Sequence, residues 1–180
     1  KNLEQDLLHF ASKDIDKIKS YCNHEISTHT FSHYYCLEPG QKIEQFKYDI
    51  KSAIKIAEQK GVDIKTIVFP RNQFNEEYRH LLISQGIKAY RGNEKSWFYK
   101  ERNGQEETLL RRLMRLIDTY INISGNHCYK IKTNTNQLIN IPSSRFLRPY
   151  NPKLKHFEKA RLGRITQSMT HAAKNGLIYH

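Results

Sequence analysis

An α/β fold built from parallel βα units is the architecture that this sequence predicts. Stretches with apolar residues at every third or fourth position alternate with short, β-branched apolar runs. Glycine closes the helical pattern at Gly61, Gly86 and Gly176, each time just before such a run. The 180 residues include eleven Tyr and eight Phe, enough for a hydrophobic core. We therefore interpret residues 1–180 as part of a single domain.

The helices and strands of the first half follow one another in a regular order. The stretch "KDIDKIKSY" predicts a helix that leads into a first strand, "HEIST". The strongest helical pattern spans residues 42–60, and its apolar face carries Ile43, Phe46, Ile50, Ile54 and Ala57. The strand "IKTIVF" follows, and we expect the 42–60 helix to cover it. A shorter helix, "NEEYRHLLISQG", then precedes the strand "IKAY".

The second half has fewer clear elements. An amphipathic helix is predicted in "EETLLRRLMRLIDTYI", with Leu109, Leu113, Leu116 and Tyr120 as its apolar stripe. A last helix, "ARLGRITQSMTHAAKNG", leads to a strand in "LIYH". The polar stretches "GNEKSWFYKERNGQEE" and "CYKIKTNTNQLINIPSSRFLRPYNPK" are expected to be loops or an insertion. Parallel βα units of this kind predict a barrel or barrel-like sheet, with functional groups beyond the carboxyl ends of its strands.

The chain is strongly basic, with 30 Lys and Arg against 18 Asp and Glu and a net charge of +12. Such a charge suits anionic partners, although a solvated lysine surface explains it equally well. Arginines cluster in "LLRRLMRL" and "SSRFLRPY", but no known nucleic-acid-binding pattern accompanies them. No apolar run approaches the roughly 20 residues that span a bilayer, so no membrane span is expected.

The densest polar stretch is "HEISTHTFSHYYC", residues 24–36. Imidazole is a common ligand of zinc and other divalent ions, and His29 and His33 are four residues apart at a predicted strand end. On a helical turn both rings could share one ion. The alternatives are one structural and one exposed histidine, or a zinc knuckle of Cys22, His24, His33 and Cys36. The knuckle spacing does not match the usual Cys and His pairs.

The stretch "HEISTHTFSH" resembles the second motif of the polysaccharide deacetylase superfamily, the carbohydrate esterases with a NodB-like domain. The resemblance implies a distorted (β/α) barrel and a divalent metal, zinc by preference, held by His29 and His33. It also implies that Thr30 supports the motif loop. The family removes N-acetyl groups from amino-sugar polysaccharides, so the implied partner is an N-acetylated glycan rather than nucleic acid.

Weaker similarities suggest further site residues. "TIVFPRNQFN" is similar to the family's third motif, which implies a substrate-binding role for Arg71. Trp97 could line the same groove. "GLIYH" resembles the strand before the fifth motif, which implies that His180 acts as general acid.

The first motif of this family, with its Asp-Asp pair, does not occur in the sequence. That pair supplies the catalytic base and the third metal ligand. We therefore expect the chain to be part of a longer protein, and to be inactive or poorly active by itself; the alternative is a degenerate, non-catalytic relative of the family. The alternative function is a non-catalytic basic module that binds nucleic acid or acidic polysaccharide, with incidental histidines.

Overall fold

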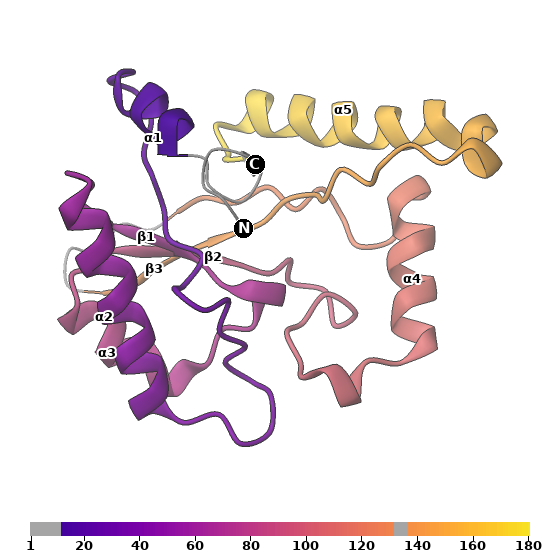
Figure 1. The fold of residues 1–180 in the computed structure, drawn as a ribbon. Coiled ribbons are helices and arrows are strands. Elements are labelled where there is room, and N and C mark those ends of the chain that lie inside the picture. The colour runs from indigo at the N-terminus through magenta and orange to yellow at the C-terminus, as the bar shows by residue number, and fades with distance from the viewer. Residues whose placement is uncertain (1–11, 132–136) are drawn as a thin grey trace.

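The computed structural model describes residues 12–131 and 137–180 of the chain. Its sheet has three parallel strands in the order β1 (Thr66–Val68), β2 (Ala89–Gly92) and β3 (Ile139–Pro142). The α-helices are α1 (Ser12–Lys19), α2 (Ile43–Gln59), α3 (Arg79–Ser84), α4 (Leu109–Tyr120) and α5 (Glu158–Asn175). Short 3₁₀ helices are η1 (Pro70–Asn72), η2 (Glu76–Tyr78), η3 (Gly104–Glu106) and η4 (Pro152–Phe157). In Figure 1, α2 and α3 lie on one side of the molecule and α4 and α5 on the other.

The predicted α/β class is confirmed, with parallel strands linked through helices. α3 connects β1 to β2, whereas α4 lies in the longer connection from β2 to β3. Thr28 adds a single parallel bridge to Ile67 on the other edge of β1, which continues the parallel arrangement by one residue. The described strands form a small sheet, and the barrel implied by the resemblance stays a prediction.

The apolar stripe of α2 builds the main core against β1, largely as predicted. Phe46 and Ile50 are fully buried and belong to one cluster with Ile67. Ile54 and Ala57 are half-buried and pack against the same cluster. The prediction was wrong for Ile43, which is 37% exposed at the first position of the helix. Figure 1 shows α2 alongside the sheet, where this stripe can face it.

The end of α2 follows from the glycine just beyond it. Gly61 has φ +63°, in the left-handed region that glycine adopts without steric cost. The amide of Gly61 donates to the carbonyl of Glu58, and that of Val62 donates to the carbonyl of Ala57, both at 2.9 Å. These bonds satisfy carbonyl groups at the helix end that would otherwise lack a partner.

Two strand predictions and one loop prediction need correction. "HEIST" contributes only the bridge at Thr28, and "LIYH" only an antiparallel bridge between Ile178 and Tyr129. β3 instead forms from "INIP", inside the stretch that was expected to be loop. The reason is tertiary: Leu138, just before β3, is buried in the core cluster, although no clear period-2 pattern surrounds it in the sequence.

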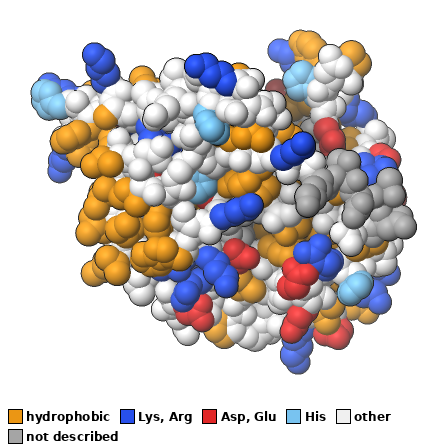
Figure 2. Space-filling view, turned by 180° about the vertical axis from the view of Figure 1, so that it is seen from behind, with side chains coloured by type: hydrophobic (Ala, Val, Ile, Leu, Met, Phe, Trp, Pro, Cys, Tyr) orange, Lys and Arg blue, Asp and Glu red, His pale blue; other side chains and the backbone are white. Residues whose placement is uncertain are grey.

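The helix α4 turns its polar side inward. Its buried side chains are Arg111 and Asp118, whereas Leu109 is 81% exposed and Leu113 is 51% exposed. Figure 2 shows hydrophobic side chains gathered over the end of the molecule that holds α4. The described helices include none with the length and apolarity needed to cross a bilayer.

Candidate functional site

The two histidines of the H-x-x-x-H motif follow directly on the segment that pairs with β1. The Thr28 amide donates to the Thr66 carbonyl at 3.2 Å, and the Thr28 carbonyl accepts from the Val68 amide at 2.9 Å. The chain then leaves the sheet, and the rings of His29 and His33 meet edge to face with centroids 4.8 Å apart. This is the carboxyl edge of the sheet, where parallel α/β folds place their sites.

A tight loop brings the two rings together, in place of the helical turn considered from the sequence. Thr30 has φ +64° and His33 has φ +58°, both left-handed conformations that are uncommon outside glycine. The Thr30 hydroxyl accepts a hydrogen bond from the Tyr34 amide at 2.8 Å. Thr30 therefore supports the loop through its own side chain.

Asp49 of α2 fixes the same loop from the core side. Its carboxylate accepts bonds from the amides of Phe31 and Ser32 at 2.8 Å and from the Ser32 hydroxyl at 2.5 Å. Asp49 is only 7% exposed and directly precedes the buried Ile50. Sequence reasoning missed this residue, although a carboxylate beside the apolar stripe of α2 was a usable signal, because a buried carboxylate needs partners.

The hydrogen bonding of His29 fits a metal ligand. Nδ1 of His29 donates to the Val68 carbonyl oxygen at 2.7 Å, since a carbonyl oxygen can only accept. In the neutral ring this bond leaves the lone pair on Nε2, the arrangement that orients metal-binding histidines. Within residues 12–131 and 137–180, however, no group of three His, Cys, Asp or Glu side chains converges on one point. The described residues thus bring two imidazole rings together without a third such side chain, and Cys22, His24, His33 and Cys36 do not converge as a zinc knuckle would require.

Aromatic contacts lead from the histidine pair to the next loop. The ring of His33 meets that of Tyr35 at 5.1 Å, and the guanidinium of Arg71 lies 4.4 Å from the centre of the Tyr35 ring. Arg71 also pairs with Glu38 at 3.4 Å. A hydrogen bond from Gln73, with further support from Gly104 and Arg71, lowers the pKa of Glu38 below its ordinary value.

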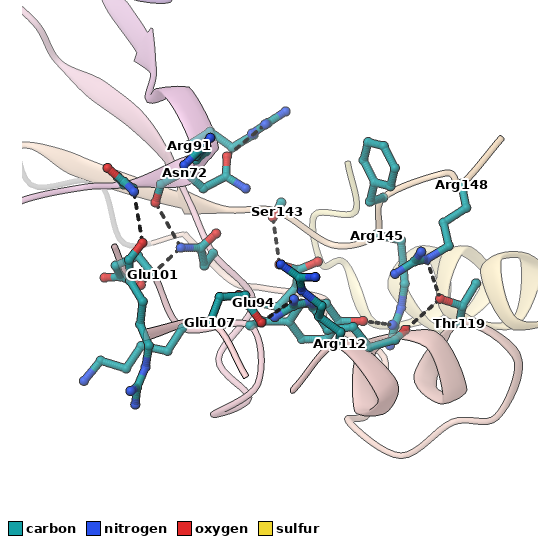
Figure 3. Close-up of a pocket in the computed structure, with 18 of the residues that line it drawn as sticks. Asn72, Arg91, Glu94, Glu101, Glu107, Arg112, Thr119, Ser143, Arg145 and Arg148 are labelled. Carbon is teal, nitrogen blue, oxygen red and sulfur yellow. Dashed lines mark hydrogen bonds and ion pairs between the residues drawn. The ribbon is translucent and has the colours of Figure 1, made fainter. Parts of the chain in front are cut away.

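Arg71 belongs to the wall of a cleft of about 720 Å³ at the carboxyl ends of the strands. The loops after β1, β2 and β3 all contribute to it, and α4 and α5 close its far side (Figure 3). Its lining is rich in cationic side chains: Arg71, Arg91, Lys100, Arg102, Arg112, Arg115, Arg145, Arg148, Arg161 and Arg164. The carboxylates in the lining are Glu94, Glu101 and Glu107. The two arginine clusters noted in the sequence therefore meet in one place.

A buried ionic network holds the far side of the cleft together. Asp118 of α4 is fully buried and pairs with Arg145, which follows β3. Its other oxygen lies 3.7 Å from Arg164 of α5. The Tyr99 hydroxyl donates to Asp118 at 2.9 Å, and the Ser124 hydroxyl at 2.6 Å. Burial opposes ionisation of Asp118, but the bonds from Arg145 and Ser124 prevail and lower its pKa.

One carboxyl group of the cleft has a raised pKa, in contrast to that of Asp118. Glu94 follows β2 and is 7% exposed, and burial raises its pKa despite a 3.1 Å bond from the Ser143 hydroxyl. A carboxyl with a raised pKa can exchange its proton nearer to neutral pH than an exposed one. Sequence reasoning missed Glu94, because a single Glu in a loop carries no pattern.

The structure places the other predicted site residues in two different places. His180 lines the cleft beside Arg145, and its backbone exchanges hydrogen bonds with Ser144 at 3.0 and 3.1 Å. Trp97 is 54% exposed and lines a smaller neighbouring pocket, with Arg111 above its ring at 5.9 Å. The two pockets share Asn93, Glu94, Lys100 and Glu101. Arg71 and His180 therefore share one cleft, with Trp97 next to it.

Comparison of the chain with family models, curated proteins and solved structures found no match.

Proposed function

We propose that this chain contributes to a metal-dependent hydrolase that removes N-acetyl groups from an amino-sugar polysaccharide. The observation that carries the proposal is the contact of the His29 and His33 rings, 4.8 Å apart, with the Nδ1 of His29 bonded to a backbone carbonyl. The resemblance of "HEISTHTFSH" to the deacetylase motif supplies the reaction class.

The proposed roles follow from where the side chains lie. His29 and His33 would hold the ion, zinc by preference, and a bound divalent ion polarises an amide carbonyl and activates water. Thr30 and Asp49 keep the loop in place through hydrogen bonds to its backbone. Such supporting residues hold metal ligands in a fixed geometry.

Other residues would act on the substrate. In amide hydrolysis water adds to the acetyl carbon, the C–N bond breaks, and the leaving nitrogen takes a proton. His180 lines the cleft and is the proposed donor of that proton. Arg71 extends from the wall nearest the histidine pair and would orient the sugar chain, while Trp97 would extend the binding surface from the neighbouring pocket.

A non-catalytic binding module is the second candidate. The excess of cationic over acidic side chains in the cleft favours it, because such an excess attracts anionic polymers without any chemistry. The two functions differ in whether the chain binds zinc through His29 and His33.

Zinc titration of the full chain, followed by calorimetry and thermal unfolding, tests the proposal. We expect one zinc ion per chain, with affinity lowered about tenfold or more by His29→Gln and by His33→Gln. At a hundredfold excess over Kd, zinc should stabilise the wild-type chain by about 2.7 kcal/mol. His171→Gln, an exposed histidine on α5, serves as the matched control and should change neither quantity.

A second readout is release of acetate from an N-acetylated oligosaccharide, which we expect to be weak or absent for this chain by itself and, where present, to be abolished by a chelator. Zinc binding that survives both His29→Gln and His33→Gln would overturn the proposal, as would the absence of any zinc binding by the wild-type chain.

A further inference from the structure

We infer that the arginine-rich cleft recognises an oxyanion on the sugar chain, so that the substrate is an anionic N-acetylated saccharide carrying carboxylate or phosphate groups. This inference rests on the proposed function, because it takes the occupant of the cleft to be the substrate of the histidine site. It adds the chemical class of that substrate.

The charge of the cleft is not balanced by its own carboxylates. Arg145, Arg115 and Arg161 are neutralised by short ion pairs with acidic side chains. Within the described part of the chain, four other lining cations form no ion pair: Arg91, Lys100, Arg112 and Arg148. These side chains are therefore available to an anionic ligand.

The available guanidinium groups are oriented by hydrogen bonds or by the helix that carries them. Nε of Arg148 donates to the Thr119 hydroxyl at 3.1 Å, which leaves both terminal nitrogens of Arg148 for a ligand (Figure 3). Arg91 donates through one terminal nitrogen to the Asn72 side-chain oxygen at 3.0 Å, which leaves its other terminal nitrogen for a ligand. Arg112 projects from α4, whose position the buried Asp118 network secures. Guanidinium forks bind carboxylate and phosphate oxygens in pairs, and a fixed fork loses less entropy on binding.

The shape of the cleft favours a saccharide over nucleic acid. A volume of about 720 Å³ between loops falls in the usual range of enclosing ligand sites. Single-stranded nucleic acid is bound along open grooves with aromatic rings for base stacking. Of the three rings in the described lining, Tyr99 is hydrogen-bonded to Asp118, and Phe146 and His180 are exposed.

Four probes of similar length test the inference by binding measurements on the full chain. They are a neutral N-acetylglucosamine hexamer, a hexasaccharide alternating N-acetylglucosamine with glucuronate, a phosphorylated N-acetylglucosamine hexamer, and a single-stranded hexanucleotide. We expect at least one anionic saccharide to bind about tenfold tighter than the neutral hexamer, and its affinity to fall with added salt. The glucuronate and phosphate probes then show which oxyanion is preferred.

Two double variants test whether the anionic saccharide binds in the cleft. Arg112→Gln with Arg148→Gln should weaken the anionic saccharide about tenfold and leave the neutral hexamer unchanged. Lys51→Gln with Lys55→Gln removes the same charge from the exposed side of α2, outside the cleft, and should have little effect. Arg112→Gln alone changes an exposed position without a described ion pair, so it should keep the fold and still weaken the anionic saccharide if the double variant fails to fold.

Three results would overturn the inference: equal binding of neutral and anionic saccharides, tighter binding of the hexanucleotide than of every saccharide, or equal losses in the cleft and control variants. None of these depends on zinc. Loss of zinc binding at His29 and His33 would instead remove the proposed function and leave the anion specificity of the cleft measurable.

Discussion

Asp118→Ala should be among the most destabilising single changes in this chain. The Asp118 carboxylate is fully buried and is paired with Arg145, with Arg164 close by. It also accepts hydrogen bonds from Tyr99 and Ser124. Alanine removes the only described carboxylate within ion-pair distance of these two arginines, and leaves two cations in the interior.

The expected cost follows from the burial of those cations. The side chain of Arg145 is 6% exposed and that of Arg164 is 2% exposed, so neither regains the hydration that it has in the unfolded chain. Removing one partner of a buried ion pair typically costs about 3–5 kcal/mol. Because the pKa of folded Asp118 lies below its ordinary value of 3.8, this stabilisation is complete at neutral pH and is lost only in strong acid.

Urea unfolding at neutral pH measures this loss. With a slope of about 2 kcal/mol per molar, a cost of about 3–5 kcal/mol lowers the midpoint by about 1.5–2.5 M. Asp63→Ala is the control, because Asp63 pairs with Lys65 at the surface and its side chain is 76% exposed. That change should cost less than about 1 kcal/mol. A midpoint shift for Asp118→Ala no larger than that for Asp63→Ala would refute the reasoning.

Two further predictions concern the core and the response to acid. Ile50→Lys should cost about 4 kcal/mol of unfolding free energy in denaturant titration, because Ile50 is fully buried. The control, Ile56→Lys on the same helix, changes a residue that is 48% exposed and should cost less than about 1 kcal/mol. Similar losses for the two variants would contradict the packing of α2. Burial, aided by the charge of Arg145, lowers the pKa of His127 from its ordinary value of 6.5 to about 4 in the folded chain. Between these two pH values the unfolded chain therefore binds a proton at His127 that the folded chain does not bind. The free energy of unfolding should therefore fall as the pH drops from about 6.5 to 4, and His127→Phe should flatten that part of the profile; an unchanged profile would show that another group is responsible.

The first half of the chain could be predicted well because local and tertiary signals agree there. The stripe of α2 has a clear helical period, Gly61 marks its end, and "IKTIVF" contains the strand that the stripe covers. β3 could not be found in this way, because "INIP" is short and half-buried and its pairing partner β2 lies some 50 residues earlier. Its existence depends on contacts distant in sequence.

The candidate site also has one part that local sequence predicts and one part that depends on contacts distant in sequence. His29 and His33 are close in sequence, so their spacing already indicated that the rings could meet. The cleft instead joins arginines from α4, from α5 and from the segment after β3, and only the fold brings these together. Sequence showed two arginine clusters but could not show that they share one wall. The sequence also did not predict that α4 buries its polar side, because the spacing of its leucines predicts the opposite orientation.

The core cluster includes no described residue of α4 or α5. Two parts of the folded chain are therefore stabilised by different kinds of interaction. α2, α3 and the strands are held by hydrocarbon and aromatic packing, which depends less on pH than ion pairs do. α4, α5 and the segment after β3 are joined largely through the charges and hydrogen bonds around Asp118. Local opening should therefore begin in the second group, so that amide hydrogen exchange separates the chain into a slow half and a fast half.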